Sequence, residues 1–166
     1  QLLNKHFSLH PSMYLDEQQP DQSYRSVRVR ITVQRQKFGS GVGLMVRALR
    51  DTPGSTADLG LPIQVGAMTQ SNSGLILVAG PTGSGKTTTV AAMVNEINES
   101  RHANIVTIED PVEYVHERKK AIINQREIGM DVADFQSGVK DALRFVPDVI
   151  VIGEIRDAET MRAALR

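Results

Sequence analysis

From residue 63 onward, the hydrophobic positions alternate between continuous runs and helical spacing. Helical spacing is found at 63–70, 87–100 and 134–146, with Asp134 as a candidate N-cap, and a further helix begins at 157. Continuous apolar runs, which are typical of strands buried on both faces of a parallel sheet, occur at 75–79, 104–109 and 148–154. Strands that alternate with helices predict an α/β fold with a parallel sheet.

Before residue 63 the pattern is different. Residues 1–26 are polar, and we expect an irregular start to the chain. Residues 27–35 alternate apolar and basic side chains, which predicts a half-buried strand with its arginines on the solvent face. Residues 44–49 are a plausible partner strand in a hairpin. Proline, glycine and serine then mark a linker. The expected organisation is therefore a partial N-terminal domain at 1–50, a linker or hinge at 51–62, and an α/β domain at 63–166.

Composition narrows the classes of protein that remain. The 166 residues suit one domain, or one domain with a small companion. The formal net charge is zero, which gives no indication of a nucleic-acid partner. The absence of cysteine excludes a disulfide framework and a thiolate zinc site within these residues. No apolar run approaches the roughly 20 residues of a transmembrane helix. Because the first residue is Gln1, we expect the chain to be a piece of a longer one.

The stretch GPTGSGKT, at 80–87, has the spacing of a phosphate-binding loop between a predicted strand and a predicted helix. Glycines let the backbone wrap around phosphates, and the backbone N–H groups at the helix start attract anionic oxygens. The lysine reaches the outer phosphates, and the threonine offers a hydroxyl to Mg²⁺. A guanine-specific motif is missing, so ATP is the favoured nucleotide. The predicted binding residues are Gly80, Pro81, Thr82, Gly83, Ser84, Gly85, Lys86, Thr87 and Thr88.

Acidic residues end two of the predicted strands. Glu154 follows the run at 148–152, and Glu109 and Asp110 follow the run at 104–108. The carboxyl ends of parallel strands face one ligand crevice, so Glu154 is a candidate to orient or deprotonate an attacking water. Glu109 and Asp110 are candidates to hold Mg²⁺ through water or to position the nucleophile. The alternatives are a surface glutamate that closes a strand and a solvated acidic turn. The predicted magnesium ligands are Thr87, Glu109 and Asp110.

These motifs together resemble the ATPases of type II and type IV secretion and of type IV pili. GPTGSGKTTT is similar to their Walker A motif, TIEDPVEYVH to their Asp box, and PDVIVIGEIRDAET to their Gly-Glu form of the Walker B motif. The nearest branch is that of the pilus retraction, or twitching motility, ATPases. The resemblance implies a RecA-like P-loop core preceded by the end of a small α+β N-terminal domain. It also implies that a His box and a C-terminal region follow in the complete protein.

The resemblance assigns catalytic roles to Glu154, Glu109, Lys86 and Arg47. Arg47 lies in the predicted hairpin, and by resemblance it approaches the γ-phosphate when the two domains close. A guanidinium there neutralises charge on the transferring phosphoryl group. The alternative for Arg47 is a solvated strand residue. One stretch departs from the family pattern: Phe145 and Val146 stand where the family usually has a polar and an acidic residue.

By the same resemblance, six subunits form a homo-hexameric ring in which Mg²⁺-dependent ATP hydrolysis opens and closes the domains about the linker. The ring is cytoplasmic, lies peripherally at the inner membrane, and acts on a membrane platform protein and thereby on pilin, with no nucleic-acid partner. Retraction is the first expectation, and pilus extension or type II or type IV secretion is the alternative within the family. Two other classes stay open: a non-catalytic nucleotide-binding or assembly module, and a small-molecule phosphotransferase.

Overall fold

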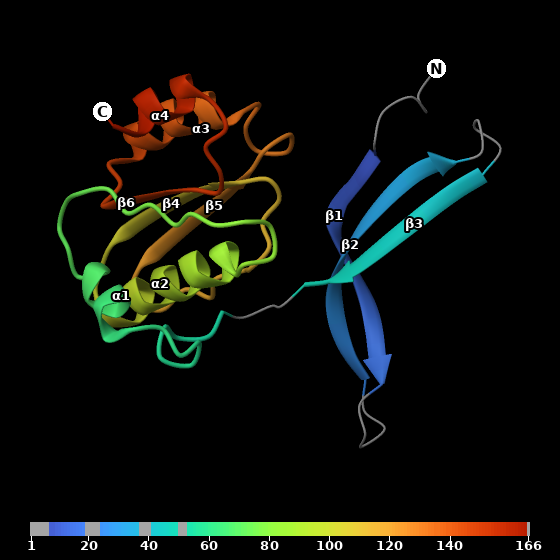
Figure 1. The fold of residues 1–166 in the computed structure, drawn as a ribbon, viewed down its shortest axis with the longest axis horizontal. Coiled ribbons are helices and arrows are strands. Elements are labelled where there is room, and N and C mark those ends of the chain that lie inside the picture. The colour runs from blue at the N-terminus through green and yellow to red at the C-terminus, as the bar shows by residue number, and fades with distance from the viewer. Residues whose placement is uncertain (1–6, 19–23, 37–40, 50–52, 166) are drawn as a thin grey trace. The chain divides into compact units, whose positions relative to one another are not determined.

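The computed structural model describes residues 7–18, 24–36, 41–49 and 53–165 (Figure 1). The chain divides into two compact units, Gln1–Asp51 and Thr52–Arg166. Each unit has its own sheet.

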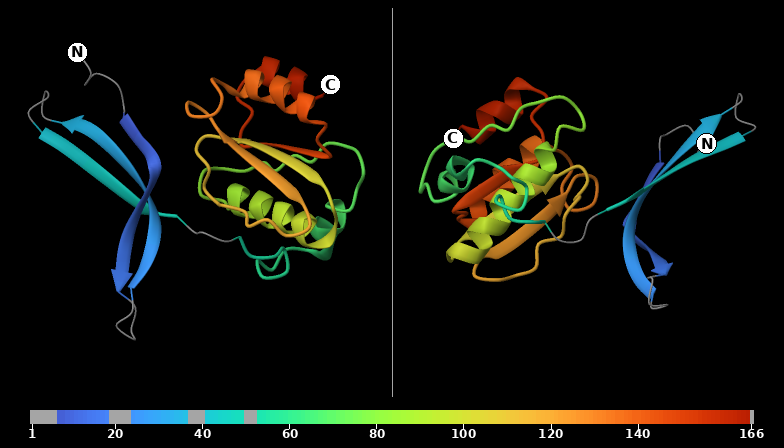
Figure 2. Two further views of the ribbon diagram at one scale, coloured as in Figure 1. Left: turned by 180° about the vertical axis from the view of Figure 1, so that it is seen from behind. Right: turned by 60° about the horizontal axis from the view of Figure 1, so that its bottom comes forward.

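The first unit contains an antiparallel sheet with the strand order β1–β2–β3 (Figure 2). Its strands are β1 (Phe7–Gln18), β2 (Tyr24–Gln36) and β3 (Gly41–Ala48). β2 and β3 pair in antiparallel register, with Arg30 opposite Arg47. The predicted hairpin is therefore confirmed.

Two expectations for the first unit are wrong. The irregular start that we predicted contains β1 and the beginning of β2, because an antiparallel partner satisfies the backbone of a polar segment without the need for an apolar run. The arginines of β2 are not all on a solvent face either. Arg28 is only 5% exposed, which is as low as the 6% of its apolar neighbour Val29.

The second unit is built on a parallel sheet with the strand order β5–β4–β6, which confirms the predicted α/β class. The strands are β4 (Asn104–Glu109), β5 (Ile122–Glu127) and β6 (Val149–Ile152). The helices are α1 (Ile63–Met68), α2 (Lys86–Ser100), α3 (Phe135–Ala142) and α4 (Ala158–Ala164), and a 3-10 helix, η2, covers Leu143–Phe145.

Helices cover both faces of this sheet (Figure 1). β4 is the central strand, and alternate side chains point to opposite layers. Ile105 packs with residues of α2, whereas Val106 and Ile108 pack with residues of α3 and α4. All three of these side chains are fully buried. The apolar run that marked the strand in the sequence is therefore the centre of a three-layer core.

Local signals set the helix boundaries. Asp134 is the N-cap of α3, as predicted, and it forms a capping box with Ser137. α3 ends at Ala142 instead of extending to 146, and the turn that follows places Val146 in the left-handed region at φ 50° and ψ 58°. Pro147 cannot continue a helix. None of the helices in the described part of the chain has the length and apolar character needed to span a membrane.

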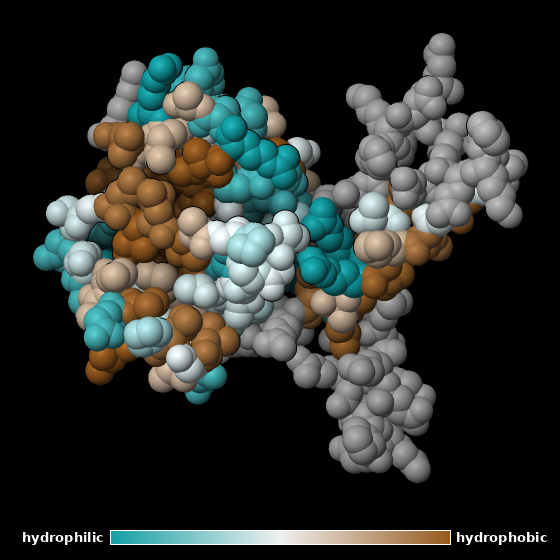
Figure 3. All heavy atoms as spheres, in the orientation of Figure 1, coloured by the Kyte–Doolittle hydropathy of each residue, from teal (hydrophilic) through white to brown (hydrophobic). Residues whose placement is uncertain are grey.

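The strand predicted at 75–79 is absent, although the local pattern is strongly apolar. Leu75, Ile76 and Leu77 are 49%, 45% and 61% exposed. Among the described residues, no strand pairs with this segment, and an extended run needs such a partner for its N–H and C=O groups. Figure 3 shows a broad hydrophobic area on the second unit, on the face crossed by the segment between α1 and α2.

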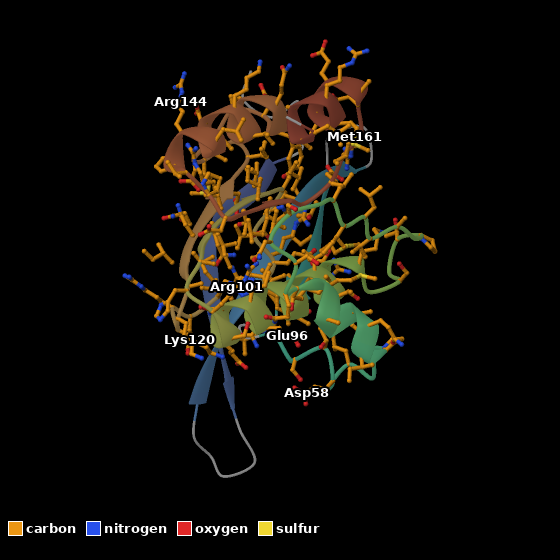
Figure 4. The ribbon with its side chains drawn as sticks, turned by 90° about the vertical axis from the view of Figure 1, so that its left-hand side faces the viewer. Asp58, Glu96, Arg101, Lys120, Arg144 and Met161 are labelled. Atoms are coloured by element: carbon orange, nitrogen blue, oxygen red, sulfur yellow. The ribbon has the colours of Figure 1, made fainter. Side chains whose placement is uncertain are left out.

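The segment predicted as a linker packs against α2 over its described part, 53–62. Pro53 and Thr56 are buried, and the Thr56 hydroxyl donates a hydrogen bond of 2.6 Å to Glu96. Figure 4 shows Glu96 on α2 and Asp58 in the neighbouring turn. Residues 53–62 therefore belong to the second unit by their contacts, and the role of 51–62 as a hinge stays a prediction.

Candidate functional site

The loop that precedes α2 has a backbone that only glycine adopts easily. Gly83 and Gly85 have φ values of 81° and 90°, in the left-handed region. At Gly80 the reason is space, because the Ser84 hydroxyl lies 2.7 Å from the place that a Cβ would occupy. The backbone therefore requires glycine at 83 and 85, whereas a side chain at position 80 would require the Ser84 hydroxyl to move.

Lys86, the first residue of α2, folds back over this loop. Its ammonium donates hydrogen bonds to the carbonyl oxygens of Gly80 at 2.9 Å and Pro81 at 3.0 Å. α2 has no acidic residue in its first turn and no side-chain cap, so its first N–H groups and positive dipole end are not neutralised by the chain itself. Thr87 is exposed beside them. A phosphate fits this combination of donors and charge.

The ends of β4 and β6 meet at Gly153. Its N–H donates to the Ile108 carbonyl at 2.8 Å, and a Cβ at Gly153 would lie 3.3 Å from the Glu109 Cα. Contacts this short leave little room for a side chain at this position. The glycine of the Gly-Glu pair at 153–154 therefore has a steric reason: it lets the backbones of two acidic strand ends come into contact.

Glu109 is held by two side-chain donors. The Thr107 hydroxyl donates to Oε1 at 2.7 Å, and the Gln125 amide donates to the same oxygen at 3.2 Å. Burial raises the pKa of the Glu109 carboxyl, and these hydrogen bonds act in the opposite direction. Asp110, the next residue, is exposed. The two acids of the predicted pair thus have different surroundings, and the hydrogen bonds from Thr107 and Gln125 hold Glu109 and not Asp110.

Glu154 lies just beyond β6 and pairs with Arg156, whose Nε is 2.9 Å from Oε1. The Glu154 side chain is 34% exposed and that of Arg156 is 79% exposed. A solvated ion pair of this kind contributes about 0–1 kcal/mol, so it holds Glu154 only weakly. The Glu154 carboxylate is accessible to water, as a residue that activates water must be.

The metal and arginine assignments stay predictions. Within the described ranges, no group of three or more His, Cys, Asp or Glu residues is placed to hold a metal ion. That finding is compatible with Mg²⁺, which usually takes one or two protein oxygens and completes its shell with phosphates and water. Thr87, Glu109 and Asp110 offer such oxygens. Arg47 lies on the exposed face of β3 in the first unit.

One set of contacts was not predicted from the sequence. The hydroxyl groups of Thr88 and Tyr114 are 3.0 Å apart and share a hydrogen bond, which joins the first turn of α2 to the segment after β4. The Gln125 amide donates to the Tyr114 carbonyl oxygen at 2.8 Å and accepts from the His116 N–H at 2.9 Å. Gln125 lies on β5, a mostly polar strand whose pattern gave no clear signal in the sequence.

Comparison with known proteins agrees with these features. Residues 52–166 match a family described as type II/IV secretion system protein. A twitching motility protein of Neisseria gonorrhoeae is 47% identical over 127 residues, which cover 76% of this chain. The type IV pilus retraction ATPase PilT of Pseudomonas aeruginosa is 44% identical over 125 residues, or 75% of this chain. A crystal structure of the pilus retraction motor PilT with bound ADP superimposes with a TM-score of 0.76, at 42% identity over 93% of this chain.

The matches cover only part of each relative. They span 34% of the Neisseria protein, 36% of the Pseudomonas protein and 43% of the crystallised PilT chain. The chain thus corresponds to about a third of the length of the curated relatives. Activities that depend on the remainder of those proteins do not transfer with the match itself.

Proposed function

The chain belongs to the family of type II/IV secretion system proteins, and from this premise we propose that it is the nucleotide-binding part of a motor subunit that hydrolyses ATP to retract type IV pili. The observation that carries the proposal is the contact at Gly153. It brings the end of β6, before Glu154, against the end of β4, at Glu109, in the same unit as a glycine loop suited to phosphates. Relatives described as a twitching motility protein and as a pilus retraction ATPase support retraction as the work performed.

In this proposal each residue has a defined task. The N–H groups of the loop and Lys86 bind the phosphates of ATP, and this requires the Lys86 ammonium to exchange its two carbonyl partners for phosphate oxygens. Mg²⁺, when bound beside Thr87, neutralises charge on the phosphates. Glu154 accepts a proton from the attacking water or orients it, and its weak pairing with Arg156 leaves it free to turn toward that water. Glu109, on the neighbouring strand β4, helps to position the attacking water.

The mechanical part of the proposal concerns the whole protein. Six copies form a ring, and hydrolysis changes the placement of the first unit relative to the second. Arg47 of the first unit then supplies a guanidinium to the transferring phosphoryl group, which in other P-loop enzymes accelerates hydrolysis by about 10³–10⁵. Residues 53–62 move with the second unit, since Thr56 is bonded to Glu96. The ring works in the cytoplasm, against a platform protein of the inner membrane and through it on pilin.

Two alternatives are separated from retraction by experiment. The family description covers secretion as well as pili, so pilus extension or protein secretion by the same chemistry is the first. The second is a module that binds nucleotide without hydrolysing it. The test is to measure the ATPase activity of the complete gene product and of its variants Lys86→Ala and Glu154→Gln. Hydrolysis by the wild type excludes the second alternative, and binding without hydrolysis supports it. We expect Lys86→Ala to abolish nucleotide binding, and Glu154→Gln to keep binding while losing turnover by about 10²-fold or more.

The matched control for Glu154→Gln is Glu159→Gln on α4, an exposed acid five residues further along that should leave turnover unchanged. Light scattering with and without Mg-ATP gives the mass, and a particle of six subunits is expected. The motor would be refuted if the wild-type protein were a monomer that binds ATP but does not hydrolyse it. Deletion of the gene, followed by a twitching assay and a secretion assay, distinguishes retraction from the other kinds of work.

A further inference from the structure

The segment between β4 and β5 is bonded to the first turn of α2. Tyr114 is only 8% exposed, and its hydroxyl lies 3.0 Å from that of Thr88. Thr88 follows Lys86 and Thr87, the two residues of the turn proposed to contact phosphate and Mg²⁺. A contact with Tyr114 therefore joins the nucleotide-binding turn to a segment that lies 26 residues away in the sequence.

Gln125 continues this connection to Glu109. Its amide nitrogen donates to the Tyr114 carbonyl at 2.8 Å and to the Glu109 carboxylate at 3.2 Å. Its amide oxygen accepts from the His116 N–H at 2.9 Å. Two amide hydrogens and one amide oxygen are thus all engaged, and a side chain with every polar atom engaged has one orientation available to it. No other residue type of the same length offers two donors and an acceptor in this arrangement.

The bonds form one continuous path. It runs from Thr88 to Tyr114 through the two hydroxyl groups, from Tyr114 to Gln125 through the backbone carbonyl, and from Gln125 to the Glu109 carboxylate. Thr107 closes the far side by donating to the same Glu109 oxygen at 2.7 Å. Glu109 therefore has a defined position relative to the first turn of α2, although the two lie on different elements.

We propose that Tyr114 and Gln125 are positioning residues, which hold the Glu109 carboxylate at a fixed place relative to the phosphate-binding turn of α2. This inference rests on the proposed ATPase function. A catalytic group displaced by about 1 Å loses about 10²-fold in rate, so a path of hydrogen bonds that removes such freedom acts on turnover. Of the predicted nucleotide-binding residues, the path includes only Thr88, through its hydroxyl, and both variants leave the loop, Lys86, Thr87 and Thr88 unchanged. The loss should therefore fall on kcat and not on KM.

The test uses the complete gene product and two variants that preserve side-chain size. Gln125→Glu keeps the acceptor for His116 and replaces the two donors with a carboxylate oxygen that faces Glu109. We expect kcat to fall by about 10- to 100-fold. Tyr114→Phe removes only the hydroxyl, and we expect a fall of about 3- to 10-fold, because the carbonyl bond to Gln125 remains. KM for ATP and the Kd of a fluorescent ADP analogue should change by less than about twofold in both variants.

The matched control is Asn124→Asp, the same amide-to-acid change on the neighbouring residue of β5. Asn124 is exposed, its side chain pairs with Asn104 at 3.4 Å, and it takes no part in the path. This control should keep wild-type kcat. Thermal unfolding of all three variants shows whether Gln125→Glu alters folding. If it does, the kcat of Tyr114→Phe still tests the positioning role.

A double variant separates positioning from a general structural role. In a Glu109→Gln background, Tyr114→Phe should no longer lower kcat, since the group that it positions has been changed. An equal fall in both backgrounds would overturn the inference, as would wild-type kcat in Tyr114→Phe and Gln125→Glu. If the wild-type protein itself shows no turnover, the proposed function fails, and this inference fails with it. If the wild type is active and the variants are equally active, only the positioning role fails.

Discussion

Asn98 makes a prediction whose size follows directly from its contacts. It is fully buried on α2. Its amide nitrogen donates to the Glu117 carbonyl at 2.7 Å, and its oxygen accepts from the N–H groups of Lys119 at 3.1 Å and Ala121 at 3.2 Å. One side chain therefore fixes three backbone groups of the segment between β4 and β5. Figure 4 shows Lys120, within this segment, near the same end of α2 as Arg101.

Asn98→Ala removes all three bonds at once. Ala121 is fully buried, so its N–H loses a partner that water cannot replace, which costs about 1–3 kcal/mol. Glu117 and Lys119 are exposed, so water offsets part of the loss and each contributes about 0.5 kcal/mol. We expect a total near 3 kcal/mol for opening this segment. Hydrogen exchange at the Ala121 amide should then become about 100-fold faster in the complete gene product.

Asn95→Ala is the matched control. Asn95 has the same side chain, lies on the same helix and is also buried at 7% exposure, but it bonds only to the side chains of Glu99 and Lys119. Those partners reach water when released, so we expect a loss of about 0.5 kcal/mol and no change at the Ala121 amide. Equal effects of the two substitutions, or unchanged protection of Ala121 in Asn98→Ala, would show that the bonds to the segment do not stabilise it.

Three further substitutions test other features. Burial, and to a smaller degree the charge of Lys119, lowers the pKa of His116 from 6.5 to about 4, so its contribution to stability is complete above pH 6.5 and is lost as the pH falls toward 4. The pKa shift sets an upper limit of about 3 kcal/mol for this loss of unfolding free energy, and partial exposure of His116 reduces it to about 1–2 kcal/mol. In urea unfolding, His116→Gln should therefore lose about 1–2 kcal/mol less than the wild type between pH 6.5 and 4. An unchanged acid dependence would contradict this. Val146→Gly should raise stability by about 1 kcal/mol in thermal unfolding because φ is 50° there, whereas Val115→Gly should not. At Gly138 a new Cβ would lie 2.9 Å from Ile108, so Gly138→Ala should cost about 1–3 kcal/mol by the same measurement, and a neutral result would mean that the core adapts.

The parts of the fold that the sequence predicted correctly are those that local pattern decides. β4, β6 and α2 were recognised because burial on both faces demands continuous apolar residues, and because a helix covering a sheet repeats its apolar positions. The N-cap at Asp134 was recognised because the capping chemistry is local. β5 was not recognised. It is an edge strand of the sheet, it alternates only weakly, and pairing with β4 holds it in place.

The segment at 75–79 shows that an apolar pattern alone can predict a strand that does not form. Its composition is that of a buried strand, yet pairing is a property of two segments, and no strand in the described part of the chain pairs with it. Val146 is similar. The sequence showed that Phe145 and Val146 depart from the polar and acidic pair of the family, but not that the second position lies in the left-handed region. Asn and Asp are several-fold enriched there among residues other than glycine, so an acidic residue suits the backbone better than valine does.

In the candidate site too, features set by local sequence could be predicted, whereas contacts that depend on strand pairing could not. The glycine loop and the acidic strand ends could be found from the sequence, because phosphate binding needs a run of glycines and parallel strands deliver their ends to one edge. What holds Glu109 could not be found, because Thr88, Tyr114 and Gln125 come from three elements and meet only through the register of β4 with β5. A shift of that register by one residue would turn Gln125 to the opposite face and place Asn124 or Arg126 toward Glu109. The contact with Glu109 is thus a consequence of strand pairing, and this is why the kinetic effect of Gln125→Glu, set against Asn124→Asp, tests the register and the positioning role together.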